Sequence, residues 1–298
     1  MLRTLTILLV TSLLPVVASA QMPTTQLYVF DLRIGDTLIT LTNPRYLSQF
    51  NAAGYNNQPY WAEDDVLYAS VRMPEKTQPD IYRFDLGNGT RQQMTDTEAG
   101  EYSPKVQVRG GDRFTAIRQE YVGSDTVLRL WDFPADLSES GRPVFTSLDN
   151  IGYYEWLNPS QLALYLTENP SRLVLSAAGD GATPQTLATN TGRSFARLRN
   201  GDLVYVDKNF SPYRLMQRNL YRLDENPTAM IELPDGTEDF IVLRDGSLLT
   251  GRGSKLYRHF PGGIREWQLV ADLNFYGFRD ITRMAVSEDG QLAVVAEN

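Results

Sequence analysis

The sequence predicts an all-β fold, a six-bladed β-propeller of four-stranded blades, and three observations carry this prediction. A strand–turn–strand unit recurs six times at near-constant spacing. The second strand of the unit is apolar on consecutive positions. Each end of the chain holds only part of a unit that is complete elsewhere. Short strands repeated with a period in the forties are typical of propeller blades.

The repeat is visible from equivalent positions in the first strand of each unit. These positions follow one another at intervals of 42 to 50 residues and are Trp61, Val106, Trp156, Leu198, Val242 and Val286. Three of the turns between the two strands hold Asn-Gly or Asp-Gly pairs, at 200–201, 245–246 and 289–290. Such pairs tolerate the positive φ of tight hairpins.

The second strands predict how the units pack. Residues 162–166 and 292–296 are apolar throughout, whereas a strand with one wet face would alternate polar and apolar side chains. A continuous apolar run indicates that both faces of the strand are covered. A blade pressed between two neighbouring blades satisfies this condition.

The chain ends predict how the ring closes. A third strand follows the hairpin at 80–86 (DIYRFDL), and we expect similar third strands at 128–133, 172–177, 219–224 and 255–260. Residues 26–32 (QLYVFDL) match this strand but have no hairpin before them, and the hairpin at 283–296 has no third strand after it. We therefore expect N-terminal outer strands to pair with the C-terminal hairpin in one shared blade, which leaves no open sheet edge.

Residues 1–20 have the pattern of a signal peptide. They contain one basic residue, Arg3, an apolar run from Leu5 to Val17, and a small-x-small end at 18–20. The apolar run is shorter than the ~20 residues that span a bilayer, which argues against a membrane anchor. We expect a periplasmic or secreted protein that begins at Gln21, with one propeller domain over residues 21–298. The chain has no Cys, which excludes disulfides and Cys-ligated zinc.

The first full repeat resembles the repeat of TolB-type propellers, which belong with other WD-like propeller repeats. Residues 56–104 read NNQPYWAEDDVLYAS…PDIYRFDLGNGTRQQMTDT…EYSP. The later repeats match that pattern in outline. The resemblance implies a propeller fold along the mature chain. TolB carries an additional N-terminal α/β domain, and prolyl oligopeptidases carry a hydrolase domain. We expect neither domain in this chain. The resemblance therefore implies the propeller fold but not the functions of those proteins.

Charge and composition exclude several classes of function. The net charge of −8 disfavours nucleic acid, whose phosphates repel an acidic chain. His259 is the single His and lies in a predicted third strand, so we expect no Ser-His-Asp triad, and a histidine-rich zinc site would need further His residues. The stretch GRSFA at 192–196 is a near match to a nucleophile elbow that lacks this partner. We interpret His259 as a partly buried strand residue. We also expect that the protein has no membrane-spanning segment and that it is a monomer.

Three aspartates near the ends of predicted third strands, Asp31, Asp85 and Asp132, invite a catalytic interpretation. An Asp at that place accepts hydrogen bonds from backbone N–H groups of the turn that follows. We therefore interpret all three as structural.

The loops that lead into the inner strands are the candidate site, because they gather at one mouth of the channel. The predicted ligand- or partner-binding residues are Tyr55, Asn57, Glu101, Tyr102, Tyr153, Tyr154, Glu155, Arg193, Glu238, Asp239, Arg279 and Asp280. Glu98 lies in one of the same loops. This mixture suits a protein partner, a saccharide or a hard cation, and the alternative is an acidic, solvated rim.

Two functions follow from these predictions. The first is a non-catalytic, exported propeller that binds an envelope or extracellular protein, or a small ligand such as a saccharide; it needs no cofactor. The alternative is a Ca²⁺-dependent hydrolase of the lactonase or esterase type, in which channel carboxylates and amides hold the metal. No catalytic residue or metal ligand is assigned for either.

Overall fold

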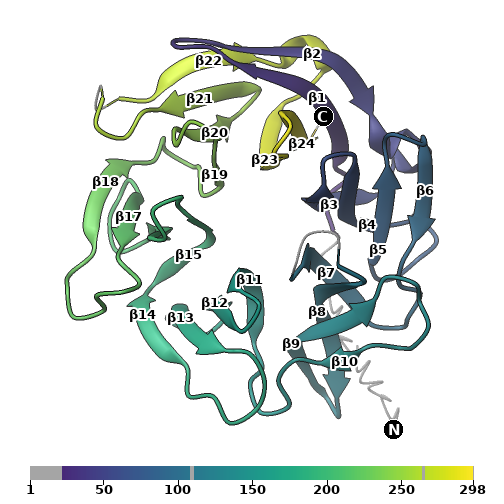
Figure 1. Cartoon of the computed structure of the whole chain (residues 1–298). Coiled ribbons are helices and arrows are strands. Elements are labelled where there is room, and N and C mark those ends of the chain that lie inside the picture. Colours follow the sequence, from purple (N-terminus) through teal and green to yellow (C-terminus); the bar gives the residue numbers. More distant parts are fainter. Residues whose placement is uncertain (1–21, 108–110, 264–265, 298) are drawn as a thin grey trace, which may run out of the picture.

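The computed structural model describes residues 22–107, 111–263 and 266–297, and in it six four-stranded antiparallel sheets surround a central channel (Figure 1). We number the blades along the chain: blades 1 to 5 are β3–β6, β7–β10, β11–β14, β15–β18 and β19–β22, and blade 6 combines β23, β24, β1 and β2. The predicted all-β six-bladed propeller is confirmed. The predicted leader at 1–20 and its cleavage before Gln21 lie outside the described residues.

Each blade places its four strands in order from the channel to the outer wall. The first strands line the channel and are β3 (Tyr55–Glu63), β7 (Gly100–Val106), β11 (Ile151–Asn158), β15 (Thr191–Arg197), β19 (Phe240–Val242) and β23 (Asp280–Val286). The second strands are β4 (Val66–Arg72), β8 (Arg113–Val122), β12 (Gln161–Leu166), β16 (Leu203–Asp207), β20 (Leu248–Arg252) and β24 (Gln291–Glu297). The third strands are β5 (Asp80–Asp85), β9 (Asp125–Pro134), β13 (Arg172–Ala177), β17 (Arg214–Arg218), β21 (Lys255–His259) and β1 (Gln26–Ile34). The fourth strands are β6 (Thr90–Gln93), β10 (Arg142–Pro143), β14 (Gln185–Thr189), β18 (Thr228–Glu232), β22 (Gln268–Asp272) and β2 (Ile39–Tyr46).

Helix is nearly absent from the described part of the chain. It consists of two 3₁₀ segments, η1 (Leu47–Asn51) and η2 (Asn274–Tyr276). None of the described helices has the length and apolar character needed to cross a membrane.

The hydrophobic core is divided among the spaces between blades. Six clusters of buried side chains each join two neighbouring blades. In the cluster between blades 6 and 1, Leu27 and Val29 pack with Trp61 and Leu67. The second strands sit between two such clusters, which explains their continuous apolar runs: six consecutive residues of β24 are buried. Each fully buried Leu or Val stabilises the fold by roughly 1.5–3 kcal/mol.

The shared blade has the predicted arrangement. Its strand order is β2-β1-β24-β23, so the N-terminus provides the two outer strands and the C-terminal hairpin the two inner strands. The pairing of β1 with β24 is continuous from Gln26 opposite Ala296 to Asp31 opposite Gln291. This ladder is the closure of the ring.

One predicted strand is misplaced. The third strand of blade 4 is β17 at 214–218, and residues 219–224 form turns instead. The reason is burial: Leu215 is fully buried, whereas Tyr221 in the predicted segment is 75% exposed. The resemblance of NLYRLD to other third strands did not reflect which residues face the core.

The three aspartates have structural partners, as expected, but only Asp85 uses the backbone of its turn. Its Oδ1 accepts a hydrogen bond from the Asn88 N–H at 2.9 Å. Asp31 and Asp132 lie inside β1 and β9 and accept instead from arginine side chains, Arg45 at 3.0 Å and Arg113 at 2.8 Å. The third strands of blades 6 and 2 continue beyond these positions, to Ile34 and Pro134, so neither Asp stands at the start of a turn.

Candidate functional site

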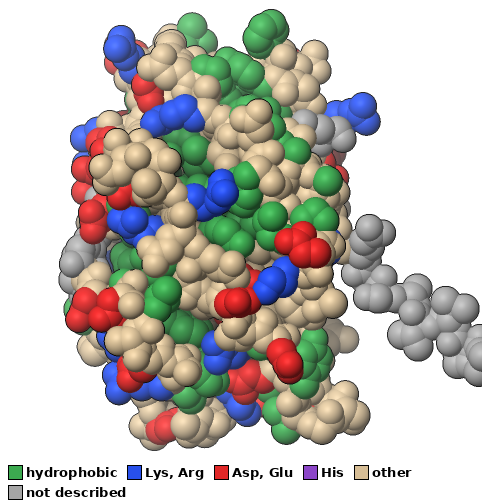
Figure 2. All heavy atoms as spheres, turned by 90° about the vertical axis from the view of Figure 1, so that its right-hand side faces the viewer, with side chains coloured by type: hydrophobic (Ala, Val, Ile, Leu, Met, Phe, Trp, Pro, Cys, Tyr) green, Lys and Arg blue, Asp and Glu red, His purple; other side chains and the backbone are tan. Residues whose placement is uncertain are grey.

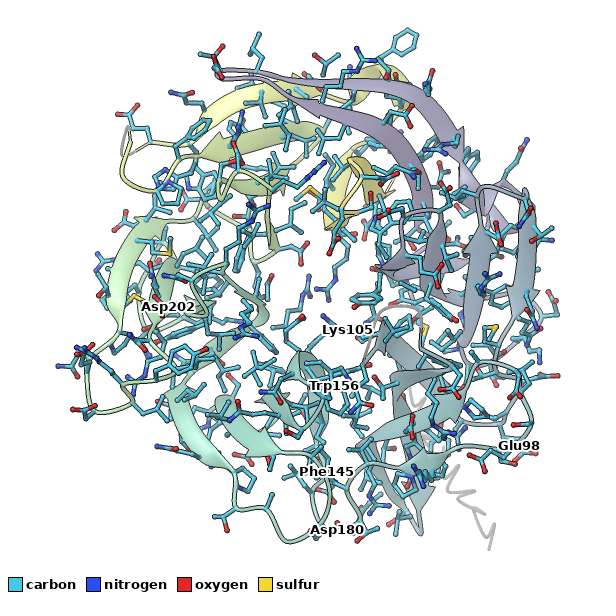
Figure 3. The ribbon with its side chains drawn as sticks, viewed as in Figure 1. Glu98, Lys105, Phe145, Trp156, Asp180 and Asp202 are labelled. Atoms are coloured by element: carbon cyan, nitrogen blue, oxygen red, sulfur yellow. The ribbon has the colours of Figure 1, made fainter. Side chains whose placement is uncertain are left out.

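A cavity of about 320 Å³ occupies the central channel, and all six inner strands contribute to its lining. The lining follows the sequence repeat. The equivalent positions of the six units, from Trp61 to Val286, serve as the reference. The residues three positions before them all line the cavity and are Gln58, Ser103, Tyr153, Phe195, Asp239 and Arg283. The residues one position before them also line it and are Tyr60, Lys105, Glu155, Arg197, Ile241 and Ala285. Two sets of six residues, one of each set from every blade, thus recur around the cavity wall, and further residues of the same strands, such as Arg193, complete the lining. Figure 3 shows Lys105 reaching into the channel.

Irregular pairing lets the inner strands present these side chains. Register shifts interrupt the pairing of β3, β7, β11, β15 and β23 with their second strands, and β3 and β11 have a second shift near their ends. A β-bulge breaks the alternation of a strand and re-aims its side chains. At two of the shifts a non-glycine residue adopts positive φ, Gln58 at 55° and Ser103 at 53°. The Oε1 of Gln58 accepts a hydrogen bond from the Ser103 N–H at 2.9 Å, which joins the two irregular segments.

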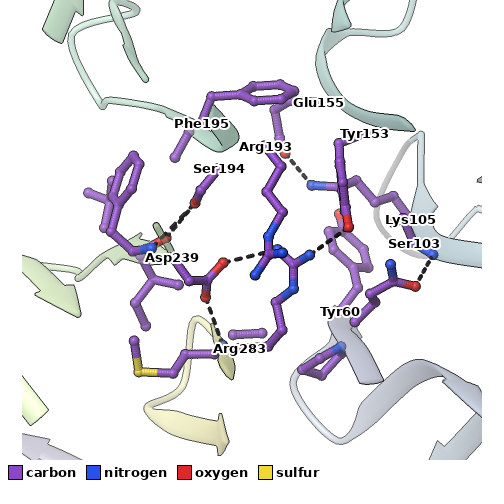
Figure 4. Close-up of a pocket in the computed structure, with 18 of the residues that line it drawn as sticks. Tyr60, Ser103, Lys105, Tyr153, Glu155, Arg193, Ser194, Phe195, Asp239 and Arg283 are labelled. Atoms are coloured by element: carbon purple, nitrogen blue, oxygen red, sulfur yellow. Dashed lines mark hydrogen bonds and ion pairs between the residues drawn. The ribbon is translucent and has the colours of Figure 1, made fainter. Parts of the chain in front are cut away.

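Arg283 forms the centre of the polar network in the cavity (Figure 4). Its Nη1 donates to Asp239 Oδ1 at 3.0 Å and its Nη2 donates to the Tyr153 hydroxyl at 2.7 Å. Asp239 also accepts from the Met284 N–H at 3.2 Å. Burial raises the pKa of Asp239, and the nearby Arg283 and Arg193 oppose that rise. The arrangement joins blades 3, 5 and 6 across the channel.

A second ion pair crosses the cavity between blades 2 and 3. Lys105 donates to the Glu155 carboxylate, and these two residues are 50 positions apart in the sequence. With Arg283 and Asp239, this pair occupies both carboxylates that line the cavity.

Arg193 also points into the cavity, from β15, but only its backbone is fixed by a hydrogen bond (Figure 4). Its backbone N–H donates to Glu238 Oε1 at 2.8 Å. Gly192 permits this approach, because a Cβ at 192 would lie 2.9 Å from the same Glu238 oxygen and 2.7 Å from Val206. The Nε of Arg193 is buried without a hydrogen-bond partner among the described residues.

Five of the twelve predicted site residues line the cavity: Tyr153, Tyr154, Glu155, Arg193 and Asp239. Tyr154 is almost fully buried there, and its hydroxyl donates to the Thr115 carbonyl at 2.7 Å, so it fastens blade 3 to blade 2. The other four present charged or phenolic groups to the cavity.

Three further predicted residues lie next to the cavity. Glu238 holds the Arg193 backbone, and Asn57 accepts a hydrogen bond from the Gln58 N–H within the irregular part of β3. Tyr55 is buried beside Tyr153 and Arg283, and burial raises its pKa.

The remaining four predicted residues do not line the cavity. Glu101 is fully buried and accepts from Arg118 at 2.8 Å. The hydroxyl of Tyr102 donates to Gln78 and Gln119, and burial raises its pKa to about 12. Arg279 and Asp280 are exposed before and at the start of β23. Glu98 is exposed near the outer edge of the molecule, away from the channel (Figure 3).

Lys105 and Arg283 are cavity residues that sequence reasoning missed. The prediction used the loops before the inner strands, whereas the cavity is lined by the strands themselves. The repeat contained the necessary signal, since both residues stand at the offsets of one and three residues described above. Alignment of the six units would have identified them.

Two motifs considered for catalysis have structural roles or lie elsewhere. The Ser194 hydroxyl of GRSFA donates to the Phe240 carbonyl and accepts from the Phe240 N–H, both at 3.3 Å, which links blades 4 and 5. His259 is buried in β21, a third strand, beside the ring of Trp267. Among the described residues, no group of three or more His, Asp or Glu side chains is placed to hold a metal ion.

The fold and cavity define a six-bladed β-propeller with a charged central channel. Solved structures share this fold at low sequence identity. A protein from Agrobacterium tumefaciens assigned as TolB aligns over 93% of this chain and 99% of its own, with a TM-score of 0.65 and 10% identity. One chain of a nidogen/laminin complex aligns over 91% of this chain and 98% of its own, with a TM-score of 0.62 and 13% identity. TolB from Acinetobacter baumannii aligns over 92% of this chain and 64% of its own, with a TM-score of 0.55 and 13% identity.

These similarities establish a TolB-like propeller fold. No protein-family model matches the sequence, and a comparison with curated proteins finds no match either.

Proposed function

We propose that this chain is a non-catalytic binding protein whose ligand site is the central channel. The observation that carries the proposal is the cavity itself, into which all six inner strands direct side chains. Its volume of about 320 Å³ lies in the range of small-molecule sites. Its charged groups are held by ion pairs between different blades, so they are positioned before a ligand arrives.

The outer wall offers less to support a binding site. Figure 2 shows one side of it, where acidic and basic side chains are interspersed without a concentration of one sign. A small ligand in the channel is therefore our preferred form of the binding function over a protein partner on this wall.

The test is a thermal-shift screen of residues 21–298 against small metabolites, with a variant that fills the channel. Ala196 lines the cavity and also packs against the core between blades 4 and 5, so Ala196→Trp would occupy part of the cavity and is used once a cooperative melting transition shows that it folds. Ala135→Trp, in the turn after β9, is the matched control, because Ala135 does not line the cavity. We expect a ligand that raises the melting temperature of the wild type and the control but not of Ala196→Trp. Ligands that stabilise all three proteins equally would refute a site in the channel.

The channel does not favour the alternative of a Ca²⁺-dependent hydrolase. Calcium takes six to eight oxygen ligands, several of them usually carboxylates. The two carboxylates lining the cavity are engaged by Lys105 and Arg283, and metal binding would have to break both pairs. Metal analysis of the purified protein and a lactone-hydrolysis assay with Ca²⁺ and with chelator test this preference. Hydrolysis that requires calcium would establish the alternative.

We also propose that the protein is exported to the periplasm or secreted. The composition of residues 1–20 supports this proposal. The intact mass of protein recovered from outside the cytoplasm should correspond to a chain that begins at Gln21. A protein that retains residues 1–20 would contradict it.

A further inference from the structure

The channel has the opposite electrostatic character to the chain as a whole. The chain carries a net charge of −8, but four basic and two acidic residues of the described part of the chain line the cavity: Lys105, Arg193, Arg197 and Arg283, with Glu155 and Asp239. Both acidic groups are paired with basic ones, as described above. Of the two other basic residues, Arg197 is exposed and donates to the Leu157 carbonyl and the Tyr221 hydroxyl. Arg193 is therefore the basic group that remains available inside a narrow space, where low-dielectric walls strengthen its field.

Among the basic residues that line the cavity, Arg193 is the one that most clearly lacks a partner. Its guanidinium makes no hydrogen bond or ion pair with the described residues, and its Nε is buried. Nearby carboxylates are already occupied: Glu238 by the Arg193 N–H and by Lys208 at 3.7 Å, and Asp239 by Arg283. A buried donor without an acceptor is rare in proteins, and a ligand can supply the missing acceptor.

The opposite mouth of the channel adds a second, independent observation. A cavity of about 520 Å³ lies at the hairpin turns between first and second strands, and it shares Arg197, Val242 and Val286 with the channel cavity. Arg199 and Arg244 line it, are exposed, and form no ion pair with the described part of the chain. The same mouth carries acidic residues from blades 1 and 6, namely Asp64, Glu288 and Asp289.

We propose that the channel binds a small carboxylate anion, with Arg193 as its principal contact and with entry along Arg199 and Arg244. A guanidinium and a carboxylate can form two parallel charge-assisted hydrogen bonds, and Arg193 has its guanidinium free for them. Arg283 adds positive charge on the other side of the cavity while its own hydrogen bonds hold it in place. This inference rests on the proposed function and assigns a ligand class to the same site.

The experiment is isothermal titration calorimetry of residues 21–298 with matched probes that differ in charge. Glucuronate is compared with glucose, succinate with succinamide, and lactate with lactamide; inorganic phosphate tests for a site that accepts any anion. We expect at least one carboxylate to bind and its neutral counterpart to bind at least tenfold more weakly. Neutral probes that bind as well as the carboxylates, phosphate that binds more tightly than every carboxylate, or no carboxylate binding at all would overturn the inference.

Variants locate the contact. Arg193→Gln should weaken carboxylate binding at least tenfold and leave the melting temperature of the free protein nearly unchanged. Arg33→Gln is the matched control, because Arg33 is exposed on β1 and lines neither cavity. Arg199→Gln with Arg244→Gln should slow association several-fold and reduce its dependence on salt. Equal binding by the Arg193 and Arg33 variants would overturn the assignment of Arg193.

The channel-filling variant separates this inference from the proposed function. If a neutral compound binds the wild type but not Ala196→Trp, and no carboxylate binds, the channel is a ligand site and the anion inference is wrong. If carboxylate binding persists in Ala196→Trp, the site lies elsewhere and the proposed function itself fails.

Discussion

Arg193 and Arg283 share one cavity and differ in what each contributes to stability. Arg283 neutralises Asp239, whose side chain is only 14% exposed, whereas the guanidinium of Arg193 has no such partner. A buried carboxylate that loses its cation is strongly destabilising, but a cation that has no partner can be removed at little cost. The charge of Arg283 is therefore structural, whereas the charge of Arg193 is available to a ligand.

This difference gives a prediction for the free protein. Arg283→Gln should lower the free energy of unfolding by about 2–4 kcal/mol, because Asp239 stays buried without its ion pair. Arg193→Gln should change it by less than about 0.5 kcal/mol. Urea unfolding of both variants at pH 7 measures the contrast, and similar losses would mean that Arg193 is also a structural residue.

Asp80 predicts a dependence of stability on pH. Burial, with the nearby charge of Glu101, raises the pKa of Asp80 to about 6, against about 3.9 in an unfolded chain. The folded state thus binds this proton more tightly, so the stabilisation is complete below about pH 4 and is lost as the pH rises through 6. Burial raises the pKa of Glu101 as well, which acts in the same direction.

Asp80→Asn keeps the side chain neutral at every pH and should remove much of this dependence. Between pH 4.5 and 7, the melting temperature of the wild type should fall more than that of the variant. The amide oxygen of the variant can still accept from Thr95 and Thr97, but its NH2 group cannot accept from Gln93, which keeps only its bond to the Thr95 carbonyl. At pH 7 the variant should therefore be more stable by at most roughly 3 kcal/mol. Parallel melting curves across this pH range would show that Asp80 titrates normally.

At the scale of a single element, β15 shows how local shape places a functional side chain. Gly192 lies in its irregular segment, where Glu238 and Val206 approach too closely for a Cβ. The close approach lets Glu238 bond to the Arg193 backbone, and this bond supports the direction of the arginine side chain.

Gly192→Ala should therefore be destabilising by about 1–3 kcal/mol, because the added methyl group overpacks the contact with Val206. It should also weaken any ligand that depends on Arg193. Gly87→Ala is the control, since its Cβ would meet nothing closer than 3.5 Å and its φ is not positive. Differential scanning calorimetry of the two variants makes the comparison; equal melting temperatures would remove the role given to Gly192.

The strands also show which features could be predicted from the sequence and which could not. Apolar runs and turn pairs are local, and they located the inner strands and the shared blade. The bulges depend on pairing between strands, so the local pattern of one repeat did not show that Lys105 and Arg283 face the channel; only alignment of all six repeats could have pointed to them. The partners of these residues are distant in the chain: Tyr153 is 130 positions from Arg283. Burial decided against Glu101, which looked like a site residue because it stands in a polar loop.

At the scale of the whole molecule, the shared blade makes both chain ends necessary for stability. Deletion of residues 21–41 removes β1, which covers β24, and deletion of 283–298 removes the partners of β1. Each deletion loses several buried side chains worth roughly 1.5–3 kcal/mol apiece, against a typical domain stability of about 5–15 kcal/mol.

Both truncated proteins should therefore aggregate or lose a cooperative melting transition. A double deletion should rescue neither, because five blades no longer meet around the channel. Size-exclusion chromatography and calorimetry provide the readout. A soluble 21–41 deletion with the wild-type melting temperature would show that β1 does not close the ring.

The pairing of β1 with β24 also sets an order of events during synthesis. The first strand, β1, pairs with the last strand, β24, and blades 1 to 5 are translated between them. Until then one edge of β1 is uncovered, and an uncovered strand edge can pair with another chain. A contact between such distant segments also forms slowly, because it closes a loop nearly as long as the protein. Blades 1 to 5 are each built from consecutive strands, whereas blade 6 forms only when β24 pairs with β1.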